Sequence, residues 1–137
     1  MALNGKNPVQ ALRLLQTVES PMEYGMISFT SNPSCLYPTY IKAQAYLASG
    51  QATDAATEFQ KIIDHAGMVW NCATGALAHL GLARANALES KKAKGAVADA
   101  ARVRALNQYK QFLDLWKDAD PGVPIFKMAK AEYAKLL

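Results

Sequence analysis

The stretch AQAYLASGQATDAATEFQKII, residues 43–63, decides the fold of this 137-residue chain. It begins with a small residue, Ala43, and an aromatic residue follows three positions later. After Gly50 the order repeats, with Ala55 and then Phe59 four positions on. Alanines let the two helices of a hairpin approach closely, aromatic rings fill the space to the next hairpin, and glycine closes the turn. The stretch therefore predicts two antiparallel helices joined by a tight turn.

A second unit repeats this order further along the chain. The segment LGLARANALES, residues 80–90, supplies Ala83 in its first helix. The segment RALNQYKQFL, residues 104–113, supplies Ala105 and Tyr109 at the spacing that alanine and phenylalanine have in the first unit. Self-similarity of this kind is the signature of helical repeat proteins.

The second unit departs from the first in two ways. Asn86 stands where the first unit has a tyrosine, and an insertion around residues 91–100 separates its two helices. Gly81, within its first helix, permits close approach of a neighbouring element. Residues 8–18 resemble the second half of a repeat whose first half is missing, so we expect the chain to begin inside a repeat array.

The rest of the chain is also of helix-forming composition. It contains 25 alanines, and alanine has the highest helix propensity of all residues. Clusters of glycine, proline and serine divide it into segments. No segment shows sustained period-two alternation of β-branched residues, so the fold class is expected to be all-α. The expected helices run over residues 8–18, 38–49, 52–65, 73–89, 97–117 and 124–137.

The order of small residue, aromatic, turn, alanine and aromatic is the tetratricopeptide pattern. Taken whole, the sequence resembles the tetratricopeptide region at the C-terminal end of bacterial eukaryotic-like serine/threonine protein kinases. Three stretches carry the resemblance: YPTYIKAQAYLASGQ (37–51), EFQKIIDHAGMVWNCATGALAHLGLARA (58–85) and FLDLWKDADPGVPIFKMAKAEYAKLL (112–137).

The resemblance implies one domain over residues 1–137, in which antiparallel hairpins stack as a short right-handed superhelix. Its parts would be a half repeat, two repeats and a C-terminal capping helix, over residues 8–18, 37–66, 72–117 (with the insertion near 91–100) and 124–137. It also implies a kinase domain and usually a membrane helix upstream. Similar arrays follow winged-helix DNA-binding domains, which is the alternative attachment.

No catalytic signature of a kinase occurs in these residues. The sequence has no glycine-rich nucleotide loop, no HRD-like catalytic loop and no DFG-like metal site. We therefore expect a non-catalytic protein-interaction or scaffold module of a larger signalling protein, without a cofactor. Any phosphotransfer activity would belong to an upstream domain.

The net charge of +4 comes from the last third of the chain. Residues 1–90 carry five basic and six acidic side chains, whereas residues 91–137 carry ten basic and five acidic ones. The lysines are spread along helical segments, apart from a cluster at Lys91, Lys92 and Lys94, and no arginine–aromatic interleaving accompanies them. A solvated face is favoured over a nucleic-acid surface, while a DNA- or RNA-associated module that uses residues 91–104 and the last helix is the alternative.

Cysteine and histidine suggest two chemical sites that we weigh and set aside. Cys35 and Cys72 lack a CxxC spacing; they would form a disulfide in an oxidising compartment, but two buried thiols are favoured because cysteine is commonly buried. A zinc site would add His65 and His79, yet their seven-residue steps from Cys72 match no common ligand pair. A thiol enzyme that pairs Cys72 with His79 lacks any evident oxyanion donor.

The aromatic residues are expected to pack between hairpins and not to form a ligand-binding box, because most fall on predicted buried stripes. Trp70, in the loop 67–71, is expected to be partly exposed. The set comprises Tyr37, Tyr40, Tyr46, Phe59, Trp70, Tyr109, Phe112 and Trp116.

A partner is expected in the groove that the first helix of each hairpin lines in such arrays. The basic and asparagine residues that clamp a peptide's terminal carboxylate in some related domains are missing, since Ile41 and Gly81 stand in the corresponding places. Helical phase relative to Ala43 and Ala83 gives the groove residues: Tyr37, Tyr40, Gln44 and Arg84.

Two further expectations concern association and compartment. Residues 8–18 would expose an apolar strip that a missing partner helix should cover, so we expect self-association through them. No apolar stretch is long enough to cross a bilayer, so we expect a soluble domain, cytoplasmic or periplasmic, of a parent protein that is membrane-anchored in the kinase case. A protein or peptide is the expected partner, without direct membrane insertion.

Overall fold

The structure, a computed structural model, describes residues 7–16, 35–69 and 72–137. Every regular element in these residues is a helix and none of them lies in a strand, which confirms the all-α fold class. Among the helices of this described part, none combines the length and the apolar content that a bilayer span requires. The elements are α1 (Pro8–Leu15), α2 (Tyr37–Ala48), α3 (Ala52–Asp64), a short 3-10 helix (Ala66–Met68), α4 (Ala73–Lys92), α5 (Gly95–Leu115) and α6 (Pro124–Ala134).

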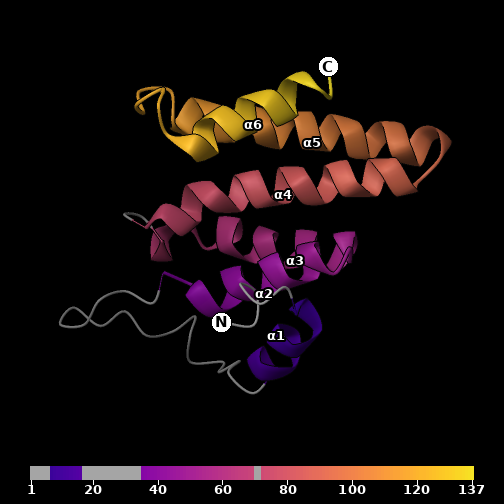
Figure 1. The fold of residues 1–137 in the computed structure, drawn as a ribbon, viewed down its shortest axis with the longest axis vertical. Coiled ribbons are helices and arrows are strands. Elements are labelled where there is room, and N and C mark those ends of the chain that lie inside the picture. Colours follow the sequence, from indigo (N-terminus) through magenta and orange to yellow (C-terminus); the bar gives the residue numbers. More distant parts are fainter. Residues whose placement is uncertain (1–6, 17–34, 70–71) are drawn as a thin grey trace.

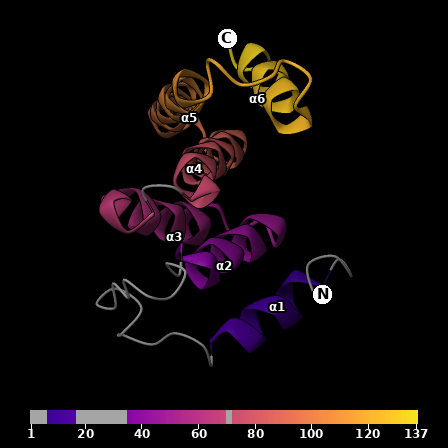
Figure 2. The same cartoon turned by 90° about the vertical axis from the view of Figure 1, so that its left-hand side faces the viewer.

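Successive helices pack against one another from α1 to α6, and α2 also contacts α4 (Figure 1). The contact between α4 and α5 is the most extensive. In Figure 2, α2 and α6 lie toward the right of the view and α3 and α5 toward the left, with α4 between them. Elements far apart in the sequence therefore share a face.

Proline and glycine set several helix ends. Pro8 opens α1, where the side chain of Asn7 accepts a hydrogen bond of 3.1 Å from the backbone N–H of Gln10. After α2, Gly50 adopts a φ of +79°. Its N–H donates to the carbonyl of Leu47, and the next N–H donates to that of Tyr46, the paired pattern of a left-handed helix stop. The expected glycine turn after α2 is confirmed.

The insertion in the second unit lengthens helices and does not form a loop. The expected helices 73–89 and 97–117 leave residues 90–96 between them, but α4 continues to Lys92 and α5 already begins at Gly95, with a φ of +57° at that glycine. Only residues 93–94 connect the two helices. Alanine and lysine dominate this segment, and both favour helix over loop.

Other helix ends also differ from the sequence-based bounds. α1 is described only to Leu15, with Gln16 as its cap, and residues 17–18 of the expected first helix lie outside the described residues. α6 ends at Ala134, three residues before the expected end, where the carbonyls of Leu136 and Leu137 instead accept hydrogen bonds from Arg102.

In the core, small residues of one helix pack against neighbouring helices and their aromatic rings. Ala43, Ala55, Ala83 and Ala105 have no solvent-exposed surface. Phe59, also fully buried, lies against Gly81, where an added Cβ would come within 2.3 Å of the ring. This distance shows why α4 carries glycine here, as the sequence predicts: any side chain would separate α3 from α4.

Two clusters of buried side chains result. The first lies among α2, α3 and α4 and includes Phe59 and Ile62, and the second lies among α4, α5 and α6 and includes Phe112 and Phe126. Phe59, Tyr109 and Phe112 are buried, which confirms inter-helix packing for these members of the aromatic set. Trp70 lies outside the described residues.

Candidate functional site

The four residues of the predicted groove occupy α2 and α4. Tyr37, at the first position of α2, has 52% of its surface exposed. One turn on, Tyr40 is half-buried and its hydroxyl accepts a hydrogen bond of 3.0 Å from the side chain of Gln44. Arg84 of α4 lies close enough for its charge to act on Tyr40. The structure thus joins Tyr40 and Gln44 directly, and places Arg84 on the helix that packs against theirs.

Burial is the main influence on Tyr40. Desolvation raises the pKa of its hydroxyl above 10.0, while the Gln44 hydrogen bond and the positive charge of Arg84 partly oppose that rise. The ring also meets Phe59 edge-on, with 5.8 Å between the ring centroids. Tyr40 therefore presents a neutral hydroxyl to the face and anchors its ring in the core.

A polar network that the sequence analysis missed connects α4, α5 and α6. The guanidinium of Arg84 donates to both carboxylate oxygens of Glu132, from Nε at 2.8 Å and from Nη2 at 2.9 Å. The hydroxyl of Tyr109 donates to the same carboxylate at 3.0 Å. Such a two-point arginine–carboxylate pair fixes geometry as well as charge. It holds α6, which packs on α5, against α4.

The ionisation of this network follows from its burial and charges. Desolvation alone would raise the pKa of Glu132, but the hydrogen bonds and charge of Arg84 outweigh it, so the pKa of the carboxyl falls below 4.5. Burial first, and then the carboxylate of Glu132, raise the pKa of the Tyr109 hydroxyl. At neutral pH the network is an arginine cation, a glutamate anion and a neutral phenol.

Arg84 consequently lies on the predicted face, but its charge is already engaged. Its side chain is 22% exposed and that of Glu132 is 31% exposed. A signal for this pair exists in the sequence, since Glu132 is the one acidic residue of the segment 124–137. That segment also holds three lysines, so the single carboxylate is a candidate for an ion pair with a basic residue of another helix.

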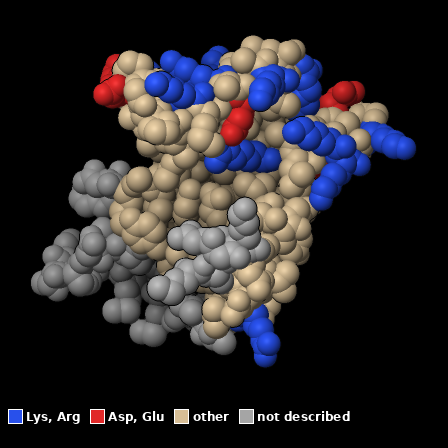
Figure 3. All heavy atoms as spheres, in the orientation of Figure 1, with Lys and Arg blue, Asp and Glu red and all other residues tan. Residues whose placement is uncertain are grey.

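A cleft lies between α4 and α6 above Tyr109, with a volume of about 430 Å³. We call it the α4–α6 cleft. Its walls are Arg84, Ala87, Leu88 and Lys91 of α4, and Glu132, Lys135 and Leu136 of α6 and the turn after it. On the face that Figure 3 shows, lysine and arginine side chains gather over α4, α5 and α6, and few are seen over the uncovered part of α2 and α3.

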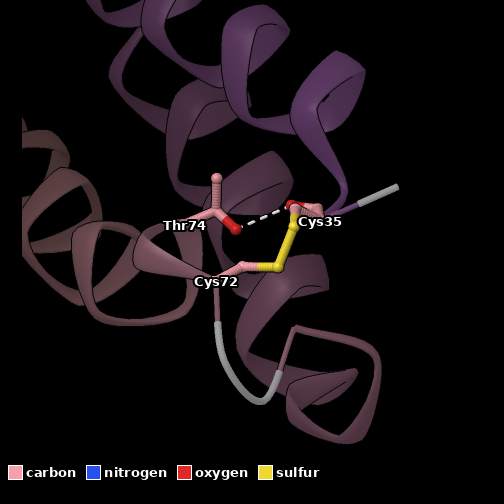
Figure 4. The surroundings of a disulfide bond; sticks show 3 residues. All are labelled: Cys35, Cys72 and Thr74. Carbon is pink, nitrogen blue, oxygen red and sulfur yellow. Dashed lines mark hydrogen bonds between the residues drawn. A yellow bond between two sulfur atoms is a disulfide. The ribbon is translucent and has the colours of Figure 1, made fainter. Parts of the chain in front are cut away.

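The cysteines form a disulfide, and the favoured interpretation of two free buried thiols is wrong. Cys35, two residues before the start of α2, is bonded to Cys72, which directly precedes the first residue of α4. The hydroxyl of Thr74 donates to the carbonyl of Cys35 at 2.7 Å beside the bond (Figure 4). Burial is compatible with either state, and the two residues are brought together because α2 packs on both α3 and α4.

The disulfide bears on the metal and thiol-enzyme hypotheses. A sulfur in a disulfide is neither a thiolate nucleophile nor a thiolate ligand. The Nδ1 atom of His79 lies 2.8 Å from the side-chain oxygen of Gln108, and that of His65 lies 2.7 Å from the carbonyl of Lys61. In the described ranges no three or more His, Cys, Asp or Glu side chains gather in a way that could hold a metal ion.

Asn86, the departure in the second unit, is buried and fully engaged. Its side chain donates to the carbonyl of Leu82 at 3.0 Å and accepts from Nε of Arg104 at 3.0 Å. Arg104 in turn pairs with Glu89 at 2.8 Å. Where the first unit uses a half-buried ring, the second unit uses a polar link between α4 and α5.

No family model, no curated protein and no solved structure matches the chain.

Proposed function

We propose that this chain is a non-catalytic protein-interaction module whose partner binds the face formed by α2, α4 and α6. One observation carries the proposal: α2 packs against α4, and the hydrogen-bonded Tyr40 and Gln44 of α2 lie within reach of the charge of Arg84 on α4. Helical repeat proteins recognise partners on such an extended shared face. Tyr37 adds an exposed aromatic ring, a residue type enriched at interfaces.

We further propose that the helices are tetratricopeptide-type hairpins in a short right-handed superhelix, with α6 as the capping helix. The burial of Ala43, Ala55, Ala83 and Ala105 supports this, because each is a small residue in the repeat pattern. The glycine stop after α2 supports it as well. Under this proposal α2 and α3 form one hairpin, and α4 and α5 form the next.

The resemblance to bacterial kinase C-terminal regions supports a place in a larger signalling protein. Kinase activity would then lie in an upstream domain, and the alternative attachment is a winged-helix regulator. The Cys35–Cys72 disulfide favours the periplasm over the cytoplasm, because disulfides persist in oxidising compartments. Sequencing the reading frame upstream of Met1 tests the attachment: a kinase domain supports it, and a winged-helix domain supports the alternative.

Site-specific photocrosslinking tests the binding face. A benzoylphenylalanine at position 37 reports on the face of α2, α4 and α6, and one at position 107 reports on the α3–α5 side, where Asn107 lines a separate cleft. We expect adducts with a partner from position 37 and few from position 107. Equal adducts from both positions, or adducts from position 107 alone, would contradict the proposal.

A nucleic-acid-associated module is the second candidate, and the ten basic residues in 91–137 favour it. Several of these basic groups already have partners within the chain, however. Arg104 forms an ion pair with Glu89, and Arg102 donates hydrogen bonds to two backbone carbonyls. The ammonium group of Lys130 lies 4.2 Å from the ring centre of Phe126. Titration of duplex DNA at rising salt separates the two. A slope of log affinity against log salt of several units would support nucleic-acid binding, and loss of all binding near physiological salt would not.

A further inference from the structure

The α4–α6 cleft has a composition that the interaction proposal does not use. Its apolar lining comes from Ala87, Leu88 and Leu136, and its polar lining combines one carboxylate with three cations. Three positive groups against one negative group leave a net charge of +2. A cleft of about 430 Å³ lies within the usual size range of sites for small ligands or short peptide segments.

The carboxylate in this cleft is already satisfied. Glu132 accepts two hydrogen bonds from Arg84 and one from Tyr109. The negative charge of Glu132 therefore offsets the positive charge of Arg84, and its carboxylate oxygens are occupied by hydrogen bonds to Arg84 and Tyr109. The excess positive charge of the cleft belongs to the two remaining cations, Lys91 and Lys135.

Within the part of the chain that the structure describes, neither lysine forms an ion pair or a side-chain hydrogen bond, and Lys135 acts on Glu132 only through its charge. The neighbouring Lys92 differs, because its Nζ donates to the carbonyl of Gly50. Lys91 and Lys135 come from separate walls, α4 and the end of α6, with leucine side chains from the same walls beside them.

Charge complementarity identifies the occupant. Carboxylates pair with unpaired lysines, and an aliphatic side chain gains free energy by covering exposed leucine surface. A run of phosphates fits less well, since the leucines offer nothing to a sugar–phosphate backbone and a carboxylate forms part of the wall. The positive surface around the cleft would also attract an acidic partner over a longer range.

We propose that the α4–α6 cleft binds an acidic peptide segment of the protein partner, in which an aliphatic residue covers Leu88 and Leu136 while flanking carboxylates pair with Lys91 and Lys135. The proposal rests on the proposed function and assigns it a second subsite, beside the tyrosine-bearing part of the same face. This subsite differs from a clamp for a peptide's terminal carboxylate because it would bind the side-chain carboxylates of the peptide.

A defined probe tests the cleft. The probe is a fluorescein-labelled, end-capped peptide in which one leucine is flanked on each side by two glutamates, and its binding to the full chain is followed by fluorescence anisotropy. The test variant is Lys91→Glu/Lys135→Glu. The matched control is Lys110→Glu/Lys117→Glu, which changes net charge equally at exposed lysines that do not line the cleft.

We expect saturable binding by the unmodified chain. The cleft variant should bind the peptide roughly tenfold or more weakly, while the control should stay within about threefold. Circular dichroism of both variants should show unchanged helicity, and a glutamine-for-glutamate peptide should bind weakly to all three proteins. Equal loss in both variants would reduce the effect to net charge and overturn the proposal, as would absence of binding to the unmodified chain.

Two further results separate this proposal from others. If labelled single-stranded DNA binds and loses its affinity in Lys91→Glu/Lys135→Glu while the peptide does not bind, the cleft is a phosphate site and the proposal is overturned. If the peptide fails but a partner still crosslinks to position 37, the α4–α6 cleft proposal is overturned and the interaction face stands. Failure of both experiments contradicts both proposals.

Discussion

The ring of Phe59 occupies the space that a side chain at position 81 would need. A Cβ built on Gly81 would lie 2.3 Å from Cε1 and Cζ of that ring, far inside the contact distance of about 3.5–4 Å between carbon atoms. Phe59 is fully buried and comes from α3, while Gly81 comes from α4. This single contact sets how closely the first pair of helices approaches the second.

Gly81→Ala is therefore expected to destabilise the fold. Alanine gains about 1 kcal/mol in helix propensity over glycine, but overpacking a core typically costs about 1–3 kcal/mol. Since the clash involves a fully buried ring, we expect the overpacking penalty to exceed the gain in helix propensity, so that the free energy of unfolding in urea falls. Gly67→Ala is the control, because a Cβ there would meet nothing within 4 Å.

A second variant tests whether the ring of Phe59 is the cause of the destabilisation by Gly81→Ala. Gly81→Ala combined with Phe59→Leu removes the ring from the clash, so the added methyl group should cost less in this background than in the unmodified chain. An equal cost in both backgrounds would show that the ring of Phe59 does not limit position 81.

The Arg84–Glu132 pair should make stability depend on pH. The folded-state pKa of Glu132 lies below 4.5, so the carboxylate contributes stability that is present above its unfolded-state pKa and lost as pH falls through the folded-state value. Glu132→Gln should cost about 1–2 kcal/mol near neutral pH, a figure reduced for the partial exposure of the pair. The gap to the unmodified chain should shrink as the pH falls below about 4.5.

The measurement is chemical denaturation of both proteins across acidic and neutral pH. Asp114→Asn, at an exposed position of α5, is the matched control and should stay within about 0.5 kcal/mol of the unmodified chain. A Glu132→Gln gap that does not change with pH would contradict the assigned role of the carboxylate.

The disulfide should stabilise the part of the fold that holds α2 and α3 on α4. It closes a sequence separation of 37 residues, for which chain-entropy arguments give about 2–4 kcal/mol. Reduction should lower the unfolding midpoint of the unmodified chain, and Cys35→Ala/Cys72→Ala should be equally destabilised but insensitive to reductant. Alkylation of both cysteines in unfolded, unreduced protein from the native compartment would contradict the bond.

α1 provides a test of self-association through residues 8–18. It packs against α2, and Val9 on it has 69% of its surface exposed. We predict a mass above that of a monomer by light scattering at high concentration, reduced by Val9→Glu because burying a charge at an apolar contact is costly. Val103→Glu, at a 55% exposed position of α5, is the control. A strictly monomeric mass at every concentration would contradict the prediction.

Local chemistry explains what could be predicted from the sequence. Small residues at Ala55 and Ala83, and glycines at Gly50 and Gly81, each act on their immediate neighbours, so their spacing alone predicts helices, a turn and a close approach. The burial of the alanines and the ring contact at Gly81 agree with those predictions. The break expected between residues 90 and 95 is present but shorter, at residues 93–94, because the helix propensity of the flanking alanines and lysines extends both helices into it.

Features that depend on long-range contacts were missed for a physical reason. Arg84 and Glu132 are 48 residues apart, and no local sequence pattern predicts which helices pack against each other. The pairing of Cys35 with Cys72 depends likewise on the packing of α2 against α4. The α4–α6 cleft could not be predicted because it depends on the Arg84–Glu132 pair: its lysines resemble an ordinary solvated face until Glu132 is known to be hydrogen-bonded to Arg84.

Binding of the purified partner, once identified by crosslinking at position 37, tests the central claim most directly. The variant is Tyr37→Ala/Gln44→Ala, which leaves the core-anchoring Tyr40 in place, and the control is Asn107→Ala on the α3–α5 side. The account predicts affinity about tenfold lower for the double variant and unchanged, within about twofold, for the control, as measured by surface plasmon resonance. Equal affinity of the double variant and the unmodified chain, with helicity intact in both, would contradict the claim that α2, α4 and α6 form the binding face.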